Sequence, residues 1–211
     1  MNWMNLTDKI IGIPVLVFLF LGMTSTLYAQ GTPFEQLKQK FEEGQVFKAE
    51  FYHQTFDSYT KDTMASRGEI WIGGERYKVK TNHQLVVVNG ETSMVYDDTR
   101  NRVIISKYVA EEDDFAPSRI LNGLDSTFTV EVQEQRGDQI YIRLESDDPF
   151  AIYKKVEIFL SPDLVPQKIR AVDPVNNVIT TTFRSGKFIS PSKQMFVLNY
   201  PGSAEVIDMR N

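Results

Sequence analysis

Hydrophobic residues recur with a helical period near the start of the chain. Three of them share one stripe at positions i, i+3 and i+7: Phe34, Leu37 and Phe41. Thr32 can cap this helix, Glu35 stands where a capping box requires it, and Gly44 can end it. The pattern predicts a helix over 32–44 that lays its apolar stripe on a sheet.

From residue 46 the period changes to two, which is typical of a strand. One face would carry apolar side chains and a histidine: Phe47, Ala49, Phe51 and His53. The other face would carry Lys48, Glu50, Tyr52 and Gln54. A polar turn follows at 57–63, so the strand is expected to end there.

The segment 67–98 has the pattern of a meander of four short strands. Its apolar runs are separated by pairs of residues that tolerate a positive φ angle, namely Gly73-Gly74, Asn82-His83 and Asn89-Gly90. The meander carries no catalytic motif. We therefore interpret it as sheet, one face of which must be covered.

The rest of the chain continues the strand pattern. A strand is expected at 102–108, a break at 111–117, and a short helix at 118–124 with Ile120, Leu121 and Leu124 apolar. Further strands are expected at 128–132, 140–144, 156–160, 164–172, 178–188 and 195–198. The pattern predicts a mainly β protein of about eleven or twelve antiparallel strands with two or three short helices.

A sheet of that length in one domain usually curls. With few helices to fill it, the curled sheet can leave an apolar hollow. A core packed solid by aromatic residues is the alternative, because the chain has 14 Phe, 9 Tyr and 2 Trp. Composition does not decide between them.

Residues 1–29 have the pattern of a secretory signal peptide. Lys9 precedes an apolar run from Ile10 to Met23, and Ala29 offers a cleavage site. The run is shorter than the roughly 20 residues that a spanning helix needs, and Pro14 interrupts it. We expect cleavage, export to the periplasm, and a single domain at 30–211. An uncleaved anchor is the alternative.

Charge and composition exclude several classes of function. The net charge of −5 argues against nucleic acid as a partner, and the absence of cysteine excludes disulfides and thiolate chemistry. Neither His53 nor His83 has metal-ligand spacing, and the acidic run 111–114 lacks the pattern of a calcium loop. We expect no catalytic residue, no metal and no cofactor.

Two acidic pairs remain, Asp97-Asp98 and Asp147-Asp148. We interpret them as strand-end and turn carboxylates; paired acids for glycoside hydrolysis are the alternative. An exported, cysteine-free β domain rich in apolar residues fits a protein that binds an apolar ligand. It also fits a filled scaffold or interaction module.

Several segments, in order, resemble the periplasmic outer-membrane lipoprotein carrier family, LolA. They are Phe47-x-Ala49-x-Phe51, Gly68-Glu69-Ile70-Trp71-Ile72, Tyr77-Lys78-Val79, Leu85 to Gly90 with Tyr96-Asp97, and Phe196 to Gly202 with Val206. Two positions depart from the family pattern. His53 replaces a glutamine, and Gly73-Gly74 replaces a basic, proline-containing turn whose arginine is thought to latch a lid.

The resemblance implies an open, incomplete β-barrel whose concave apolar face is lidded by helices and receives the acyl chains of lipoproteins. It implies three partners: acylated lipoproteins, an inner-membrane ABC-type releasing complex and an outer-membrane lipoprotein acceptor. We expect a monomer that is not an enzyme. A related envelope protein that binds lipid or glycolipid is the alternative.

We expect the acyl chains to be lined by strand and helix side chains. From the strands these are Phe47, Phe51, Trp71, Tyr77, Val86, Val88 and Tyr96, and from the helices Phe41, Ile120 and Leu121. Ordinary core packing is the alternative for each of them. Arg76 is the candidate for lid control in place of the family's arginine.

Overall fold

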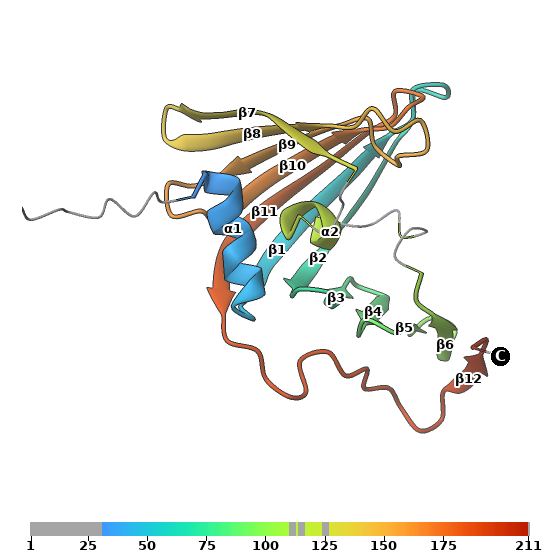
Figure 1. Cartoon of the computed structure of the whole chain (residues 1–211). Helices are drawn as coiled ribbons and strands as arrows, with labels where there is room; N and C mark the ends of the chain where they lie inside the picture. The colour runs from blue at the N-terminus through green and yellow to red at the C-terminus, as the bar shows by residue number, and fades with distance from the viewer. Residues whose placement is uncertain (1–30, 110–112, 114–116, 124–126, 211) are drawn as a thin grey trace, which may run out of the picture.

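The computed structural model describes residues 31–109, 113, 117–123 and 127–210 (Figure 1). These residues form two short helices and one sheet of twelve strands. The helices are α1 Pro33–Glu42 and α2 Pro117–Leu121. The strands are β1 Val46–Phe56, β2 Thr63–Ile72, β3 Tyr77–Lys80, β4 Gln84–Val88, β5 Thr92–Asp97, β6 Arg102–Lys107, β7 Thr129–Arg136, β8 Gln139–Glu145, β9 Lys155–Leu160, β10 Pro166–Val172, β11 Val178–Ile189 and β12 Glu205–Asp208.

The strand order across the sheet is β12-β6-β5-β4-β3-β2-β1-β11-β10-β9-β8-β7. Neighbouring strands are antiparallel, except that β12 runs parallel to β6. The end strands β12 and β7 do not pair with each other within the described residues, so the curved sheet stays open. The prediction of an open, mainly antiparallel half-barrel is confirmed.

Helix α1 begins and lies as its sequence predicts. The Thr32 hydroxyl accepts the backbone N–H of Glu35, whose carboxylate accepts the backbone N–H of Thr32 at 2.7 Å, completing the capping box. The apolar stripe of α1 is buried against the sheet, where Phe41 meets Phe188 edge to face at 5.5 Å. Figure 1 shows α1 and α2 on the concave side of the curved sheet, here called the inner face.

Buried apolar side chains form two clusters on opposite faces of the sheet. The inner cluster joins α1 and α2 to strands β1–β4 and β8–β11. The outer cluster consists of Val46, Val87, Val103, Phe196 and Leu198. Alternation along the strands separates the two, because successive side chains of a strand point to opposite faces.

The prediction of a strand at 195–198 is wrong, because these residues pack on the outer face and do not pair with the sheet. This segment belongs to a connection that follows β11 and reaches β12 at the far edge of the sheet (Figure 1). Its backbone makes local turns, with Met195 N–H donating to the Ser192 carbonyl at 3.2 Å. Phe196 and Leu198 bury their side chains on the outer face without joining the sheet, and the last strand forms later, at β12.

Two other expectations concern residues outside the described ranges. The proposed signal peptide at 1–29 is one, and Leu124 of the second predicted helix is the other. Within the described residues, no helix combines the length and the apolar character needed to cross a membrane.

Gly68 marks the place where β3 leaves β2. A Cβ atom at position 68 would lie 1.9 Å from the Lys80 carbonyl oxygen, whereas one at Gly74 would meet no atom within 4 Å. Gly68→Ala should therefore lower the free energy of unfolding by about 2 kcal/mol, because backbone must shift to admit the methyl group. Urea titration measures the change, with Gly74→Ala as the control. Equal stability of the two variants would contradict the close approach.

Candidate functional site

The inner face brings together most of the side chains expected to line a cavity. Eight of the ten expected residues lie in or against the inner cluster: Phe41, Phe47, Phe51, Tyr77, Val86, Val88, Ile120 and Leu121. The strand residues among them reach this face by alternation, as in the pairing of Tyr77 with Val88 across β3 and β4. The wall they form is aliphatic and aromatic.

Trp71 and Tyr96 do not reach the inner face, which corrects their expected placement. Ile70 and Ile72 are buried in the inner cluster, so Trp71 between them must point outward. There its ring lies near the amines of Lys48 and Lys78, at 4.9 and 5.3 Å. Tyr96 packs against the outer cluster as well. The period of two predicts that successive side chains lie on opposite faces of the sheet. It does not predict which face is concave, because both faces of this sheet are apolar.

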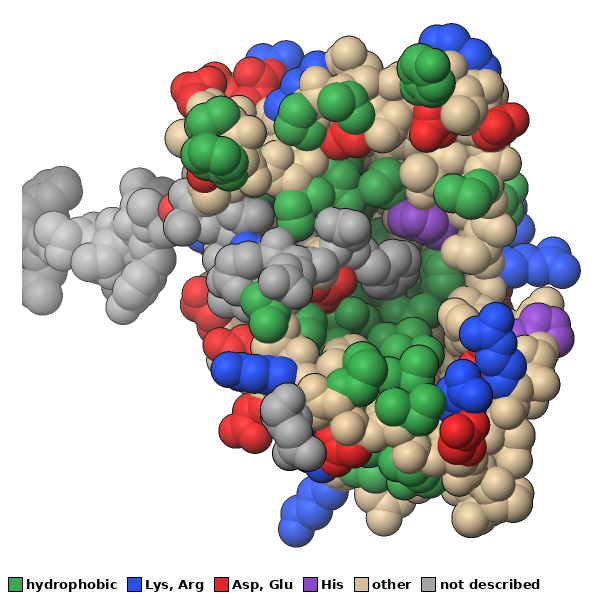
Figure 2. All heavy atoms as spheres, turned by 90° about the vertical axis from the view of Figure 1, so that its right-hand side faces the viewer, with side chains coloured by type: hydrophobic (Ala, Val, Ile, Leu, Met, Phe, Trp, Pro, Cys, Tyr) green, Lys and Arg blue, Asp and Glu red, His purple; other side chains and the backbone are tan. Residues whose placement is uncertain are grey.

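Part of the inner face is not filled by described side chains. A hollow of about 520 Å³, here called the inner hollow, has an apolar floor that includes Phe51, Tyr77, Val79 and Val86. Its polar rim includes Ser66, Arg67, Thr81, Asn82, His83 and Gln84. Figure 2 shows a recess with hydrophobic side chains at its bottom, between rims that carry polar and charged groups. The volume lies in the range of ligand pockets, roughly 300–1,000 Å³.

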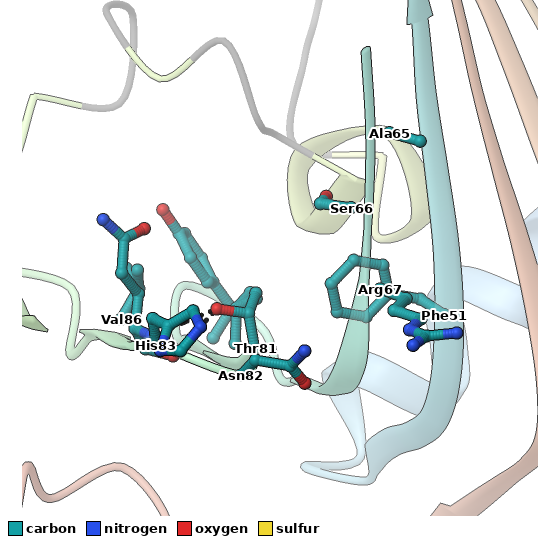
Figure 3. A pocket seen from close by; sticks show the side chains of 11 residues that line it. Phe51, Ala65, Ser66, Arg67, Thr81, Asn82, His83 and Val86 are labelled. Atoms are coloured by element: carbon teal, nitrogen blue, oxygen red, sulfur yellow. Dashed lines mark hydrogen bonds between the residues drawn. The ribbon is translucent and has the colours of Figure 1, made fainter. Parts of the chain in front are cut away.

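Two walls bound the inner hollow. Figure 3 shows Phe51, Ala65 and Ser66 on the β1–β2 wall, facing the β3–β4 hairpin that carries Thr81, His83 and Val86. Val79 lines the hollow although it was not predicted to, and its spacing of two from Tyr77 is the signal that places it on the same face. The rim residues were not predicted either, because single polar residues at strand ends carry no pattern of their own.

Two tyrosines place polar groups beside this apolar wall. The Tyr108 hydroxyl donates to the Asp113 carboxylate at 2.8 Å, and the rings of Tyr77 and Tyr108 lie edge to face with centroids 6.5 Å apart. Burial, together with the charge of Asp113 and a hydrogen bond to it, raises the pKa of Tyr77 far above its usual value. Tyr77 therefore stays protonated and serves as a neutral hydrogen-bonding group.

His53 lies further along the inner side of β1 and is half-buried. Its Nδ1 lies 2.9 Å from the Thr181 hydroxyl and its Nε2 3.3 Å from the Thr55 hydroxyl. Burial lowers the pKa of His53 below its usual 6.5. The imidazole is therefore held neutral and hydrogen-bonded at neutral pH.

Helix α2 is fastened to the β2–β3 turn by Asn122. The buried amide nitrogen of Asn122 donates to the carbonyl of Gly73 at 3.2 Å and also to the carbonyl of Gly74. Arg76, the expected lid residue, instead places its guanidinium 5.1 Å from the centre of the Phe196 ring, a side chain of the outer cluster. Within the described residues, the contact with the carbonyls of Gly73 and Gly74 is therefore made by the amide of Asn122, directly after α2.

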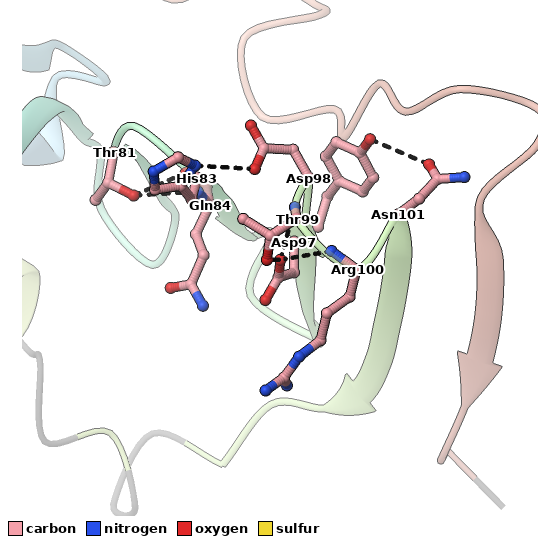
Figure 4. Close-up of polar contacts among 9 residues, drawn as sticks. Thr81, His83, Gln84, Asp97, Asp98, Thr99, Arg100 and Asn101 are labelled. Atoms are coloured by element: carbon pink, nitrogen blue, oxygen red, sulfur yellow. Dashed lines mark hydrogen bonds and ion pairs between the residues drawn. The ribbon is translucent and has the colours of Figure 1, made fainter.

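One carboxylate of each acidic pair accepts backbone N–H groups of a turn, whereas Asp98 lies 3.2 Å from His83 Nδ1. Asp97 accepts the backbone N–H groups of Thr99 at 3.0 Å and Arg100 at 3.1 Å, and the Thr99 hydroxyl together with these bonds lowers its pKa (Figure 4). Asp148 accepts the backbone N–H of Phe150 at 2.8 Å. Among the described residues, no group of three or more His, Cys, Asp or Glu side chains is placed to hold a metal ion.

A family model and several solved structures match this chain. The family model described as outer membrane lipoprotein carrier protein LolA matches residues 42–199. An uncharacterized conserved protein from Thermus thermophilus has a TM-score of 0.52 at 12% identity, with 82% of this chain and 98% of that chain covered. This likeness shows a shared fold. No curated protein matches the chain.

Two further structures have lower scores. A LolA superfamily protein from Nitrosomonas europaea has a TM-score of 0.41 at 12% identity, covering 80% of this chain and 99% of its own. A putative outer membrane lipoprotein-sorting protein domain from Vibrio parahaemolyticus has a TM-score of 0.42 at 10% identity, covering 78% and 94%.

Asn122→Ala should loosen α2. The substitution removes the amide that donates to the carbonyls of Gly73 and Gly74, so local opening of α2 should become easier and amide exchange over 119–123 roughly tenfold faster. Hydrogen exchange measured by mass spectrometry checks this. Arg76→Ala is the matched control and should leave the exchange of α2 unchanged. If Arg76→Ala accelerates exchange and Asn122→Ala does not, the assignment of the contact is wrong.

His53 should make stability depend on pH. Because the folded state lowers its pKa, the unfolded state binds the proton more readily, and stability is lost as pH falls below the usual 6.5. His53→Gln should show a smaller loss in that window, measured by urea unfolding at each pH. His83→Gln, at the exposed histidine of the rim, should retain the loss. A loss of the same size in His53→Gln would contradict the argument.

Proposed function

Because this chain belongs to the family of the outer membrane lipoprotein carrier protein LolA, we propose that it binds the acyl chains of lipoproteins and ferries them from the inner to the outer membrane. The inner hollow is the proposed binding site. Its lining would come from Phe51, Tyr77, Val79 and Val86, with α1 and α2 covering the neighbouring inner face.

The observation that carries this proposal is the hollow itself, an apolar floor inside a polar rim. Each CH₂ group that leaves water gains about 0.8 kcal/mol, so an acyl chain needs a comparably apolar surface to travel through water. A floor of aliphatic and aromatic side chains supplies that surface without directional bonds. Binding can therefore be strong enough for transport and still release the cargo.

The handling of cargo is part of the same proposal. The carrier would be a monomer, exported by cleavage after residue 29, that receives lipoproteins from an inner-membrane ABC-type releasing complex. It would deliver them to an outer-membrane lipoprotein acceptor. No catalytic step is proposed, because Asp97 and Asp148 hold turns and the inner hollow has a mainly apolar floor.

A direct test is native mass spectrometry of residues 30–211 purified from an envelope fraction without detergent. Acylated lipoprotein that copurifies with the protein supports the carrier. Copurifying lipid or glycolipid without lipoprotein would favour the related lipid-binding function instead. Bare protein that also fails to take up acylated lipoprotein or a fluorescent fatty acid would overturn both.

Adjacent residues of β4 offer a matched pair of variants. Val86 is half-buried on the floor of the inner hollow, and Leu85 is half-buried against the outer cluster. Val86→Asp should weaken the binding of a fluorescent fatty acid roughly tenfold or more, because the acyl chain would bury a charge. Leu85→Asp should leave affinity unchanged, provided that circular dichroism shows both variants folded. Equal loss in both would place the ligand elsewhere.

A further inference from the structure

Strand β2 is paired along its whole length on one side but only in part on the other. Residues 63–72 all pair with β1. On the opposite side, β3 pairs only with Glu69, Ile70, Trp71 and Ile72. The stretch 63–68 therefore has an edge without a strand partner among the described residues, and this edge borders the inner hollow.

The alternation of backbone hydrogen bonds shows which groups face that edge. The Gly73 N–H donates to the Arg76 carbonyl at 2.8 Å, so residue 73 directs its backbone groups toward the β3 side. In an antiparallel strand every second residue does the same, which gives 71 and 69, then Arg67 and Ala65. The N–H and C=O groups of Ala65 and Arg67 thus point toward the edge and have no backbone partner in the described part of the chain.

The geometry at Gly68 keeps this edge open. The Lys80 carbonyl approaches Gly68 so closely that a side chain would not fit, and the chain then turns away, with Thr81 N–H donating to the Gln84 carbonyl at 2.9 Å. The β3–β4 turn and the edge of β2 become the two sides of one opening. Figure 3 shows the gap between them, with Ser66 on one side and Thr81 and His83 on the other.

The opening combines two kinds of surface. Its floor is apolar, through Phe51, Tyr77, Val79 and Val86, and its rim offers both hydrogen-bonding side chains and the free backbone groups. An extended peptide can pair with such an edge as an added strand. An acyl chain attached to the end of that peptide would reach the apolar floor directly.

We propose that the edge of β2 at 63–68 binds the peptide segment that adjoins the acylated end of the cargo, by adding it as a short strand. The inference rests on the proposed function and deepens it. The acyl chains provide most of the affinity, while the peptide pairs with Ala65 and Arg67. Because backbone pairing does not depend on side chains, one carrier can accept cargo of many sequences.

The test compares dipalmitoylated peptide with palmitate alone. Ala65→Pro removes the N–H that faces the opening but no bond to β1, and proline is tolerated at such edge positions. Ala65→Val keeps the N–H and is the matched control. The readout is the ratio of the two affinities, because Ala65 also borders the inner hollow. Ala65→Pro should weaken binding of the acylated peptide about tenfold relative to binding of palmitate, whereas Ala65→Val should leave this ratio unchanged.

Amide exchange of the unmodified protein gives a second measurement that does not require a folded variant. The amides of Ala65 and Arg67 should become protected by dipalmitoylated peptide and not by palmitate. Palmitate bound without any protection by the peptide would overturn the inference and leave the proposed function standing. Failure to bind palmitate or acylated peptide would overturn both. Protection that grows with protein concentration without ligand would overturn the inference by assigning the edge to a second copy of the chain.

Discussion

A sheet with apolar side chains on both faces has to be covered twice, and this requirement shapes the molecule. Along β4, Val86 belongs to the inner face and Val87 to the outer face, and neither can be left in water at low cost. The helices cover the inner face. The segment that contains Phe196 and Leu198 covers the outer face near β4 and β6.

The outer face is covered more completely than the inner face, and the inner hollow lies where the inner face is left uncovered by described residues. On the outer face, the turns of the segment that contains Phe196 and Leu198 place these side chains directly against the sheet. On the inner face, α1 and the five-residue α2 cover only part of the curve, so among the described residues the inner hollow remains above Phe51 and Val86. An apolar surface left open in this way is a place where an apolar ligand gains free energy by entering.

The polar rim of the inner hollow results from the unequal lengths of β2 and β3. Strand β2 has ten residues and β3 has four, so pairing between them ends at Glu69 and Lys80. Beyond this point the edge of β2 and the β3–β4 turn diverge, and polar groups collect where the strands end. The hollow therefore has an apolar floor and a hydrogen-bonding rim, as binding an amphipathic ligand requires.

Local sequence patterns determined those elements that are stabilised by contacts between residues close together in the sequence. The capping box of Thr32 and Glu35, the alternation along β1 and the three turns of the meander were all predictable, because each depends on residues a few positions apart. The open half-barrel followed from the family resemblance and the strand count.

Features that depend on residues distant in the sequence were decided only by the tertiary structure. Trp71 and Tyr96 lie on the outer face because period two defines two faces without saying which one is concave, and both are apolar. Residues 195–198 pack without pairing, since they lie across the outer face over Val87 and Val103 and not beside a strand edge. The contact of Asn122 with the glycine turn, 48 and 49 residues away, and the inner hollow have no local signal, because they arise only when separate elements meet.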